Sequence, residues 1–232
     1  YVCSLSCRSV IYKGMFLSEN LTDFYPALLD ERFVSRFAIY HPRYSTNTFP
    51  TWKLAQPFRK VAHNGEINTI SGNTTWMRSH ETRLSHPALN QYMEDIKPVV
   101  QAAGSDTAAL DNVFELLTFA GRDAPMAKTL LVPASAGANS TMSDAARALF
   151  SYCNAVMEPW YGPAALCATD GRWIVAGLDR AGLRPLRYTI TQDGLLIVGS
   201  ETGMVRVPDA RILSRGRLGP GQTLALDLKE GR

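Results

Sequence analysis

The sequence lacks the features that mark several large classes of protein. It has no run of five or more like charges and a formal net charge of only +3, so neither nucleic-acid nor membrane binding is indicated. No apolar stretch approaches the roughly 18 residues that a membrane-spanning helix needs. Cysteine is also scarce, and no CxxC pair occurs among Cys3, Cys7, Cys153 and Cys167. This usage disfavours a secreted disulfide scaffold and a zinc site, and it is typical of a reducing cytoplasm.

The short motifs of the common enzyme superfamilies are missing as well. No GxSxG, HExxH, Walker or GxGxxG pattern occurs, which removes the anchors for hydrolase-elbow, zinc-protease, nucleotide and dinucleotide sites. What remains is a set of polar residues next to apolar segments: Arg43, Asn64, Gly65, Ser105 and Asp106. Arginine can hold an α-carboxylate, aspartate an α-ammonium, and an amide with a backbone N–H a developing oxyanion. Together they predict an amino-acid site, although each alone is more typical of a turn, a cap or an ion pair.

The stretch 63–68, HNGEIN, follows an apolar approach and allows two interpretations. Asn-Gly is a strong signal for a hairpin turn. The same pair can instead direct a side-chain amide and a backbone N–H at one point, as an oxyanion hole requires. The pair alone favours the turn, and only the other polar residues favour the oxyanion hole.

The pattern of apolar residues predicts strands, then helices, then strands. With 232 residues, of which 46% are hydrophobic, the chain can bury a substantial core. Short strands are expected within 1–17, over 33–40 and over 58–62, helical turns over 21–29, and helices over 75–84, 106–120 and 143–158. An antiparallel meander with two hairpins is expected over 165–201, and a further strand over 222–228. Because βαβ alternation is absent, this order predicts an α+β layered fold.

Several longer motifs carry a resemblance to a known family. The run from His41 to Met77, HPRYSTNTFPTWKLAQPFRKVAHNGEINTISGNTTWM, resembles the amidotransferase domain of the glutamate synthase large (alpha) subunit. HxRYST and HNG belong to class II glutamine amidotransferases generally, whereas FPTWKLAQPF and HNGEINT point to glutamate synthase. The resemblance extends over the chain, from YVCSLSCRSVIYKGM through GPAAL and DRAGLRPLRY to RGRLGPGQ.

The resemblance implies a fold and an activity. The fold would be a single partial amidotransferase domain over 1–232, a four-layer αββα sandwich of antiparallel sheets of the N-terminal-nucleophile type. Glutamine would be hydrolysed to glutamate and ammonia, and the ammonia would pass to a distant synthase domain that aminates 2-oxoglutarate. By matching position, Arg43 would bind the glutamine carboxylate and Asp106 its ammonium, with Thr46 and His63 as further substrate-binding residues. Asn64 and Gly65 would form the oxyanion hole.

The family also implies components that no residue here binds by any recognisable pattern. FMN, an iron–sulfur cluster and a nicotinamide or ferredoxin donor belong to other domains of the oxidoreductase, and we expect no metal site in this chain. The implied partners are L-glutamine, the remainder of the large subunit and a small subunit, in the cytoplasm.

Two departures from the family pattern qualify the expected activity. Family members use an N-terminal cysteine as nucleophile, whereas this chain starts at Tyr1 inside a strand-like stretch. We therefore expect a domain incomplete at its N-terminus and inactive alone. A non-catalytic glutamine-binding or interaction remnant is the alternative, and a hydrolase using Cys3 is disfavoured. The second departure is Tyr161, where aspartate is expected before a glycine turn that a tyrosine can crowd.

Overall fold

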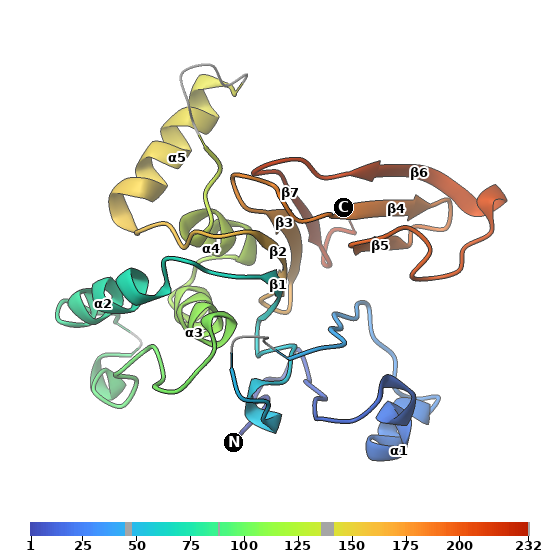
Figure 1. Cartoon of the computed structure of the whole chain (residues 1–232), viewed down its shortest axis with the longest axis horizontal. Helices are drawn as coiled ribbons and strands as arrows, with labels where there is room; N and C mark the ends of the chain where they lie inside the picture. Colours follow the sequence, from blue (N-terminus) through green and yellow to red (C-terminus); the bar gives the residue numbers. More distant parts are fainter. Residues whose placement is uncertain (45–47, 88, 136–141, 232) are drawn as a thin grey trace.

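The computed structural model describes residues 1–44, 48–87, 89–135 and 142–231. Figure 1 shows a group of helices on one side of a central sheet and a second sheet on its other side. The α-helices are α1 (Leu21–Phe24), α2 (Ile70–Glu81), α3 (Asp106–Phe119), α4 (Ala124–Leu131) and α5 (Asp144–Val156). Short 3-10 turns occupy Ser18–Asn20, Pro26–Leu29, Trp52–Leu54, Asn90–Tyr92 and Asp209–Arg211.

Two antiparallel sheets carry the fold. The first has the order β1-β2-β3-β7, made of β1 (Val61–Gly65), β2 (Ala164–Thr169), β3 (Trp173–Leu178) and β7 (Thr223–Asp227). The second has the order β5-β4-β6, made of β4 (Arg187–Thr191), β5 (Leu196–Gly199) and β6 (Ile212–Arg217). The predicted α+β class with antiparallel sheets is therefore confirmed, and β1 lies at an edge of the first sheet.

The main core fills the space between the first sheet and the helices. Leu166 and Val175 point from β2 and β3 into this core, where they meet Leu110 and Val113 of α3. Alternate residues point to the other face, as the period of a strand requires. On that face Leu178 packs with Leu186 and Val198 of the second-sheet region, together with Ala176. The first sheet is thus covered on both faces, which gives β1 a rigid support.

Side-chain caps explain why the helices begin where they do. The Ser105 hydroxyl accepts a hydrogen bond from Ala108 N at 3.1 Å before α3, and Ser143 does the same for Ala146 N at 3.3 Å before α5. Asp123 caps α4 through Met126 N at 2.8 Å. The helices predicted from Asp106 and Ser143 are confirmed. The helix expected over 75–84 lies earlier, at Ile70–Glu81, and α4 was not predicted.

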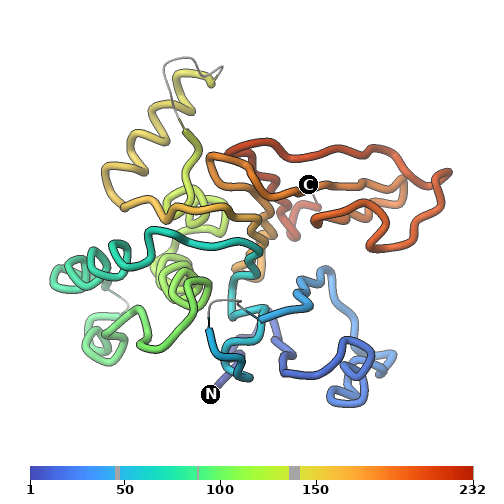
Figure 2. The backbone as a smooth tube through the Cα atoms, viewed as in Figure 1, coloured from blue at the N-terminus to red at the C-terminus, as the bar shows by residue number. Residues whose placement is uncertain are grey.

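Three strand predictions are wrong, and the reason is pairing. The segments 1–17 and 33–40 form no strand, because neither pairs with another strand within the described residues. Side chains bond the backbone there, as where Ile11 N donates to the Ser4 hydroxyl at 3.2 Å. Figure 2 shows this first part of the chain, in blue, running below the sheets and then rising into β1. The 58–62 strand is shifted to Val61–Gly65. The predicted meander is divided, since its two hairpins, β2–β3 and β4–β5, belong to different sheets.

Within the described residues, no helix is both long and apolar enough to cross a membrane.

Candidate functional site

The HNGEIN stretch lies at the end of an edge strand and not in a hairpin turn. His63, Asn64 and Gly65 are the last residues of β1, where Asn64 lies opposite Ala165 and Gly65 opposite Ala164 of β2. The turn interpretation of Asn-Gly is therefore wrong. The strand continues in line beyond its end, because Glu66 N donates to Pro163 O at 2.9 Å.

The outer edge of β1 is covered by side chains. In an antiparallel ladder, backbone groups alternate between the partner strand and the open edge. The outward N–H groups of Val61, His63 and Ile67 donate to Asp111 Oδ1 at 2.8 Å, Gln56 Oε1 at 2.8 Å and Asp106 Oδ2 at 2.9 Å. The same alternation directs the N–H of Gly65 to this edge, and no described side chain accepts a hydrogen bond from it. One backbone donor is thus left open at the end of the strand.

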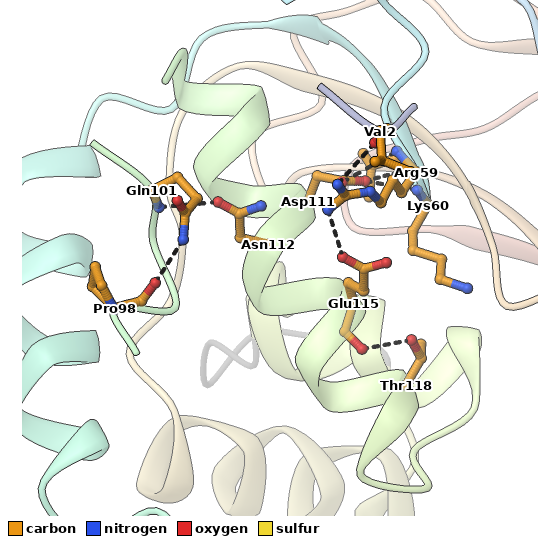
Figure 3. A network of polar contacts seen from close by, with 10 residues as sticks. Val2, Arg59, Lys60, Pro98, Gln101, Asp111, Asn112, Glu115 and Thr118 are labelled. Atoms are coloured by element: carbon orange, nitrogen blue, oxygen red, sulfur yellow. Dashed lines mark hydrogen bonds and ion pairs between the residues drawn. The ribbon is translucent and has the colours of Figure 1, made fainter. Parts of the chain in front are cut away.

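Asp111 holds the beginning of β1 in place. Its buried carboxylate accepts hydrogen bonds from Arg59 N at 3.2 Å and Lys60 N at 2.7 Å (Figure 3). It also accepts one from Val61 N at 2.8 Å. The Arg59 guanidinium in turn pairs with Glu115 of α3 at 3.3 Å. The strand is therefore fixed to α3, the helix that also carries Asp106.

Gly65 occupies a position that no other residue fits. Its φ is 150°, and a Cβ added there would lie 1.8 Å from the Pro163 carbonyl oxygen. A matching contact lies across the ladder, where a Cβ on Gly162 would lie 1.8 Å from Glu66 O. The two backbones therefore approach each other closely at the end of β1.

Asn64 is exposed beside Gly65 and is held by an arginine from a distant part of the chain. Arg184 Nη2 donates to Asn64 Oδ1 at 2.7 Å. Because the amide oxygen is occupied, the Nδ2 hydrogens of Asn64 remain as donors. An amide N–H and a backbone N–H from adjacent residues are the donors that an oxyanion hole uses.

Asp106 stands at the first position of α3 and braces the same end of β1. One carboxylate oxygen accepts from Ile67 N at 2.9 Å and the other from Thr107 N at 2.7 Å. The side chain is half-buried, and it forms no ion pair within the described residues. Its negative charge is favourably placed at the N-terminus of a helix. The carboxylate oxygens also keep lone pairs that can accept a hydrogen bond from a further donor.

His63 is buried, with 2% of its surface exposed, and its ring is only half satisfied. Nδ1 lies 2.8 Å from the Thr107 hydroxyl, whereas Nε2 has no hydrogen-bond partner in the described chain. Burial lowers the pKa of His63 below its usual 6.5, and the nearby Asp106 charge opposes this only in part. The ring is therefore neutral near pH 7.

The pH dependence of stability offers a test of this neutral histidine. Because the pKa of His63 lies below 6.5 in the fold, the unfolded chain binds the proton more tightly. Stability should be full above that pH and fall as the pH drops, by at most about 1.4 kcal/mol per unit from this group. When thermal unfolding is measured between pH 7.5 and pH 5, stability should depend less steeply on pH in His63→Gln than in the original protein. The glutamine side chain keeps a hydrogen-bond partner for the Thr107 hydroxyl. Burial also lowers the pKa of His41 and raises the pKa of Asp111 to about 7, and these two groups change stability with pH in opposite directions in both proteins, so only the difference between the two slopes reports on His63. An unchanged slope would show that His63 does not contribute.

The predicted residues are brought together only in part. His63, Asn64, Gly65 and Asp106 gather at the end of β1. Arg43 is exposed, makes no ion pair with Asp106, and is linked to the site through His41, whose Nδ1 lies 2.7 Å from Arg43 O and 3.1 Å from Arg43 N. The pKa of His41 is lowered by burial, and hydrogen bonds with the backbones of Arg43 and His63 oppose the shift. Thr46 lies outside the described residues.

Other residues at the site were not predicted. Gln56 pairs with both backbone groups of His63, since its Nε2 also donates to His63 O at 2.8 Å. Neither this role nor the contact of Arg184 with Asn64 has a sequence signal, because each requires knowledge of the tertiary arrangement. The Tyr161 ring stacks on the Arg180 guanidinium at 3.8 Å. No group of three or more His, Cys, Asp or Glu side chains suited to a metal occurs in the described part of the chain.

Comparison with known proteins gives the family. The model of class-II glutamine amidotransferases matches residues 1–232. The large chain of NADPH glutamate synthase is 62% identical over 232 residues in Azospirillum brasilense and 45% identical in Bacillus subtilis, covering 100% of this chain in both. The ferredoxin-dependent glutamate synthase of Pyropia yezoensis is 46% identical over 98% of the chain. The chain spans 15% of the length of each of these relatives.

A solved structure shares weaker similarity. Glutamine phosphoribosylpyrophosphate amidotransferase from B. subtilis is 21% identical, with a TM-score of 0.42, over 82% of this chain and 32% of its own. This likeness is too low to locate individual residues. The family match, by contrast, covers every residue, and the 232-residue chain belongs to the class-II glutamine amidotransferases.

Proposed function

We propose that this chain supplies the glutamine-binding and oxyanion-stabilising part of a glutaminase site in a glutamate synthase. The site would hydrolyse L-glutamine to glutamate and ammonia. The observation that carries the proposal is the open N–H of Gly65 beside the Asn64 amide, at an edge where the neighbouring outward N–H groups are occupied. Two adjacent donors without acceptors suit the negative oxygen of a tetrahedral intermediate.

The remaining roles follow from charge. Asp106 offers a carboxylate on the same edge for the α-ammonium of glutamine, and Arg43 offers an exposed guanidinium for the α-carboxylate. Thr46 and His63 are further substrate-binding candidates, and the neutral His63 ring keeps Nε2 free. The nucleophile that the family implies is an N-terminal cysteine thiol, and we assign that role to no residue of this chain.

The wider setting is proposed on similarity alone. Residues 1–232 would belong to a single amidotransferase domain that delivers ammonia to a synthase domain, with 2-oxoglutarate as acceptor. FMN, an iron–sulfur cluster and the NADPH or ferredoxin donor would be bound elsewhere, and a small subunit is a further candidate partner. The cysteine usage favours a cytoplasmic location.

Removing the amide donor should test the proposal most directly. In the full natural polypeptide, Asn64→Ala is expected to lower the kcat of glutamine hydrolysis about 100- to 1,000-fold with little change in KM, because the donor acts mainly on the transition state. Ammonia release gives the measurement. Asn90→Ala, at an exposed position in a 3-10 turn, is the matched control and should keep full activity.

Two results would contradict the proposal. One is a natural polypeptide that releases no ammonia from glutamine. The other is an Asn64→Ala variant whose kcat stays within a few fold of the original. Glutamine binding without hydrolysis in the natural polypeptide would favour the alternative of a non-catalytic glutamine-binding module.

A further inference from the structure

Arg184 reaches across the fold to the side chain of Asn64. The two residues are 120 positions apart, and Arg184 Nη2 lies 2.7 Å from Asn64 Oδ1. We propose that Arg184 is a positioning residue that sets which end of the Asn64 amide faces the reacting carbonyl. This inference rests on the proposed glutaminase site and adds to it a residue outside the predicted set.

The chemistry of the two groups makes the orientation definite. A guanidinium is a donor only, with no lone pair to offer. The atom of Asn64 that faces it must therefore be the amide oxygen, and Nδ2 must point away from Arg184. Without this partner the two ends of the amide are nearly equivalent in shape, and a half-turn of the amide would place an oxygen where the oxyanion hole needs a donor.

Arg184 is itself placed by a tightly bonded turn. Asp179 is fully buried, with 0% of its surface exposed. Its carboxylate accepts hydrogen bonds from Ala164 N at 2.9 Å, Ala181 N at 2.8 Å and Gly182 N at 3.3 Å. These bonds tie the start of β2 to the turn that leads into Arg184. Ala164 pairs with Gly65, and the next residue of β2, Ala165, pairs with Asn64, so the arginine and the amide share one support.

The guanidinium is not neutralised or fully bonded by the described residues. Arg184 makes no ion pair there, and its buried Nε has no hydrogen-bond partner. The positive charge also contributes to the lowered pKa of His63, which places it within electrostatic reach of the site. A charge of this sign next to Asn64 favours an oxyanion and does not oppose it.

Kinetics of variants in the full natural polypeptide should separate positioning from a structural role. Arg184→Ala is expected to lower kcat for glutamine hydrolysis by up to about 100-fold, the effect of a misaligned catalytic group, while KM changes little. Adding guanidinium ion at millimolar concentration should restore part of the lost activity. Arg184→Lys keeps the positive charge on a shorter reach without the planar guanidinium, and its kcat should lie between that of Arg184→Ala and that of the original protein. Arg187→Ala, an exposed arginine three positions along, is the matched control and should keep its kcat.

A double variant distinguishes failure of this inference from failure of the proposed function. If Arg184 acts through Asn64, adding Arg184→Ala to Asn64→Ala should lower kcat no further. Full additivity, or a lack of guanidinium rescue with unchanged circular dichroism, would overturn the inference while Asn64→Ala alone still supports the function. If Asn64→Ala has no effect, the proposed function itself fails. Should Arg184→Ala not fold, Arg184→Met is decisive, because it keeps the length of the side chain without any donor, and a normal kcat in that variant would contradict positioning by the guanidinium.

Discussion

Replacing Gly65 with alanine is expected to remove nearly all glutaminase activity and to destabilise the end of β1. The added Cβ would lie 1.8 Å from the Pro163 carbonyl oxygen and 2.8 Å from its carbon. These atoms are backbone, so no side-chain rotation relieves the contact and the strand must move. A shift of about 1 Å in a catalytic group can cost about 100-fold in rate, and overpacking costs about 1–3 kcal/mol. Ammonia release and thermal unfolding would measure the two effects.

Gly72 provides the matched control for this substitution. It lies within α2, and a Cβ added there meets no atom within 4 Å. Gly72→Ala should leave kcat unchanged and stabilise the protein by about 0.5–1 kcal/mol, since alanine is the better helix former. A Gly65→Ala variant with normal activity would contradict both the close approach of the two backbones and the role proposed for the Gly65 N–H.

Elements whose signals are local were predictable from the sequence. The serine caps and apolar stripes of α3 and α5 mark those helices without reference to the rest of the chain. The short apolar runs after residue 164, separated by turn residues, likewise mark β2 to β5 and β7. The helix α4 was missed because it has only 8 residues, although Asp123 and Pro125 are start signals in its first turn. The strand β6 was missed because its sequence, ILSRGR, is mostly polar and contains a glycine.

The assembly of the site depended on contacts that the sequence does not reveal. The pattern indicated that Asn64, Gly65 and Asp106 were candidates, yet it favoured a hairpin turn for the Asn-Gly pair. Only the register of β1 on β2 shows that Gly65 directs its N–H outward. The partners Gln56 and Arg184 belong to loops, and a loop residue's partner is set by tertiary packing and not by local pattern.

Asp111 is expected to be among the residues most important for stability. Asp111→Ala would remove the acceptor for the N–H groups of Arg59, Lys60 and Val61 and leave them unpaired at the start of β1. A buried donor left without a partner, such as Val61 N, costs about 1–3 kcal/mol, and the half-buried N–H groups of Arg59 and Lys60 add smaller costs, so we expect a loss of about 3 kcal/mol. Hydrogen exchange should show the amides of 59–61 changing from protected to rapidly exchanging, and thermal unfolding should give the loss in stability.

The neighbouring Asn112 gives the control, and the conservative variant gives a second test. Asn112 Oδ1 accepts one hydrogen bond, from Gln101 N at 3.2 Å, so Asn112→Ala should cost only about 1 kcal/mol and leave 59–61 protected. The loss of stability in Asp111→Asn should lie between the losses in Asn112→Ala and Asp111→Ala. The side-chain oxygen in Asp111→Asn can still accept from Lys60 and Val61, but its NH2 group would face the Arg59 N–H as a second donor. If Asp111→Asn is as stable as the original protein, then the carboxylate is not needed to hold the start of β1.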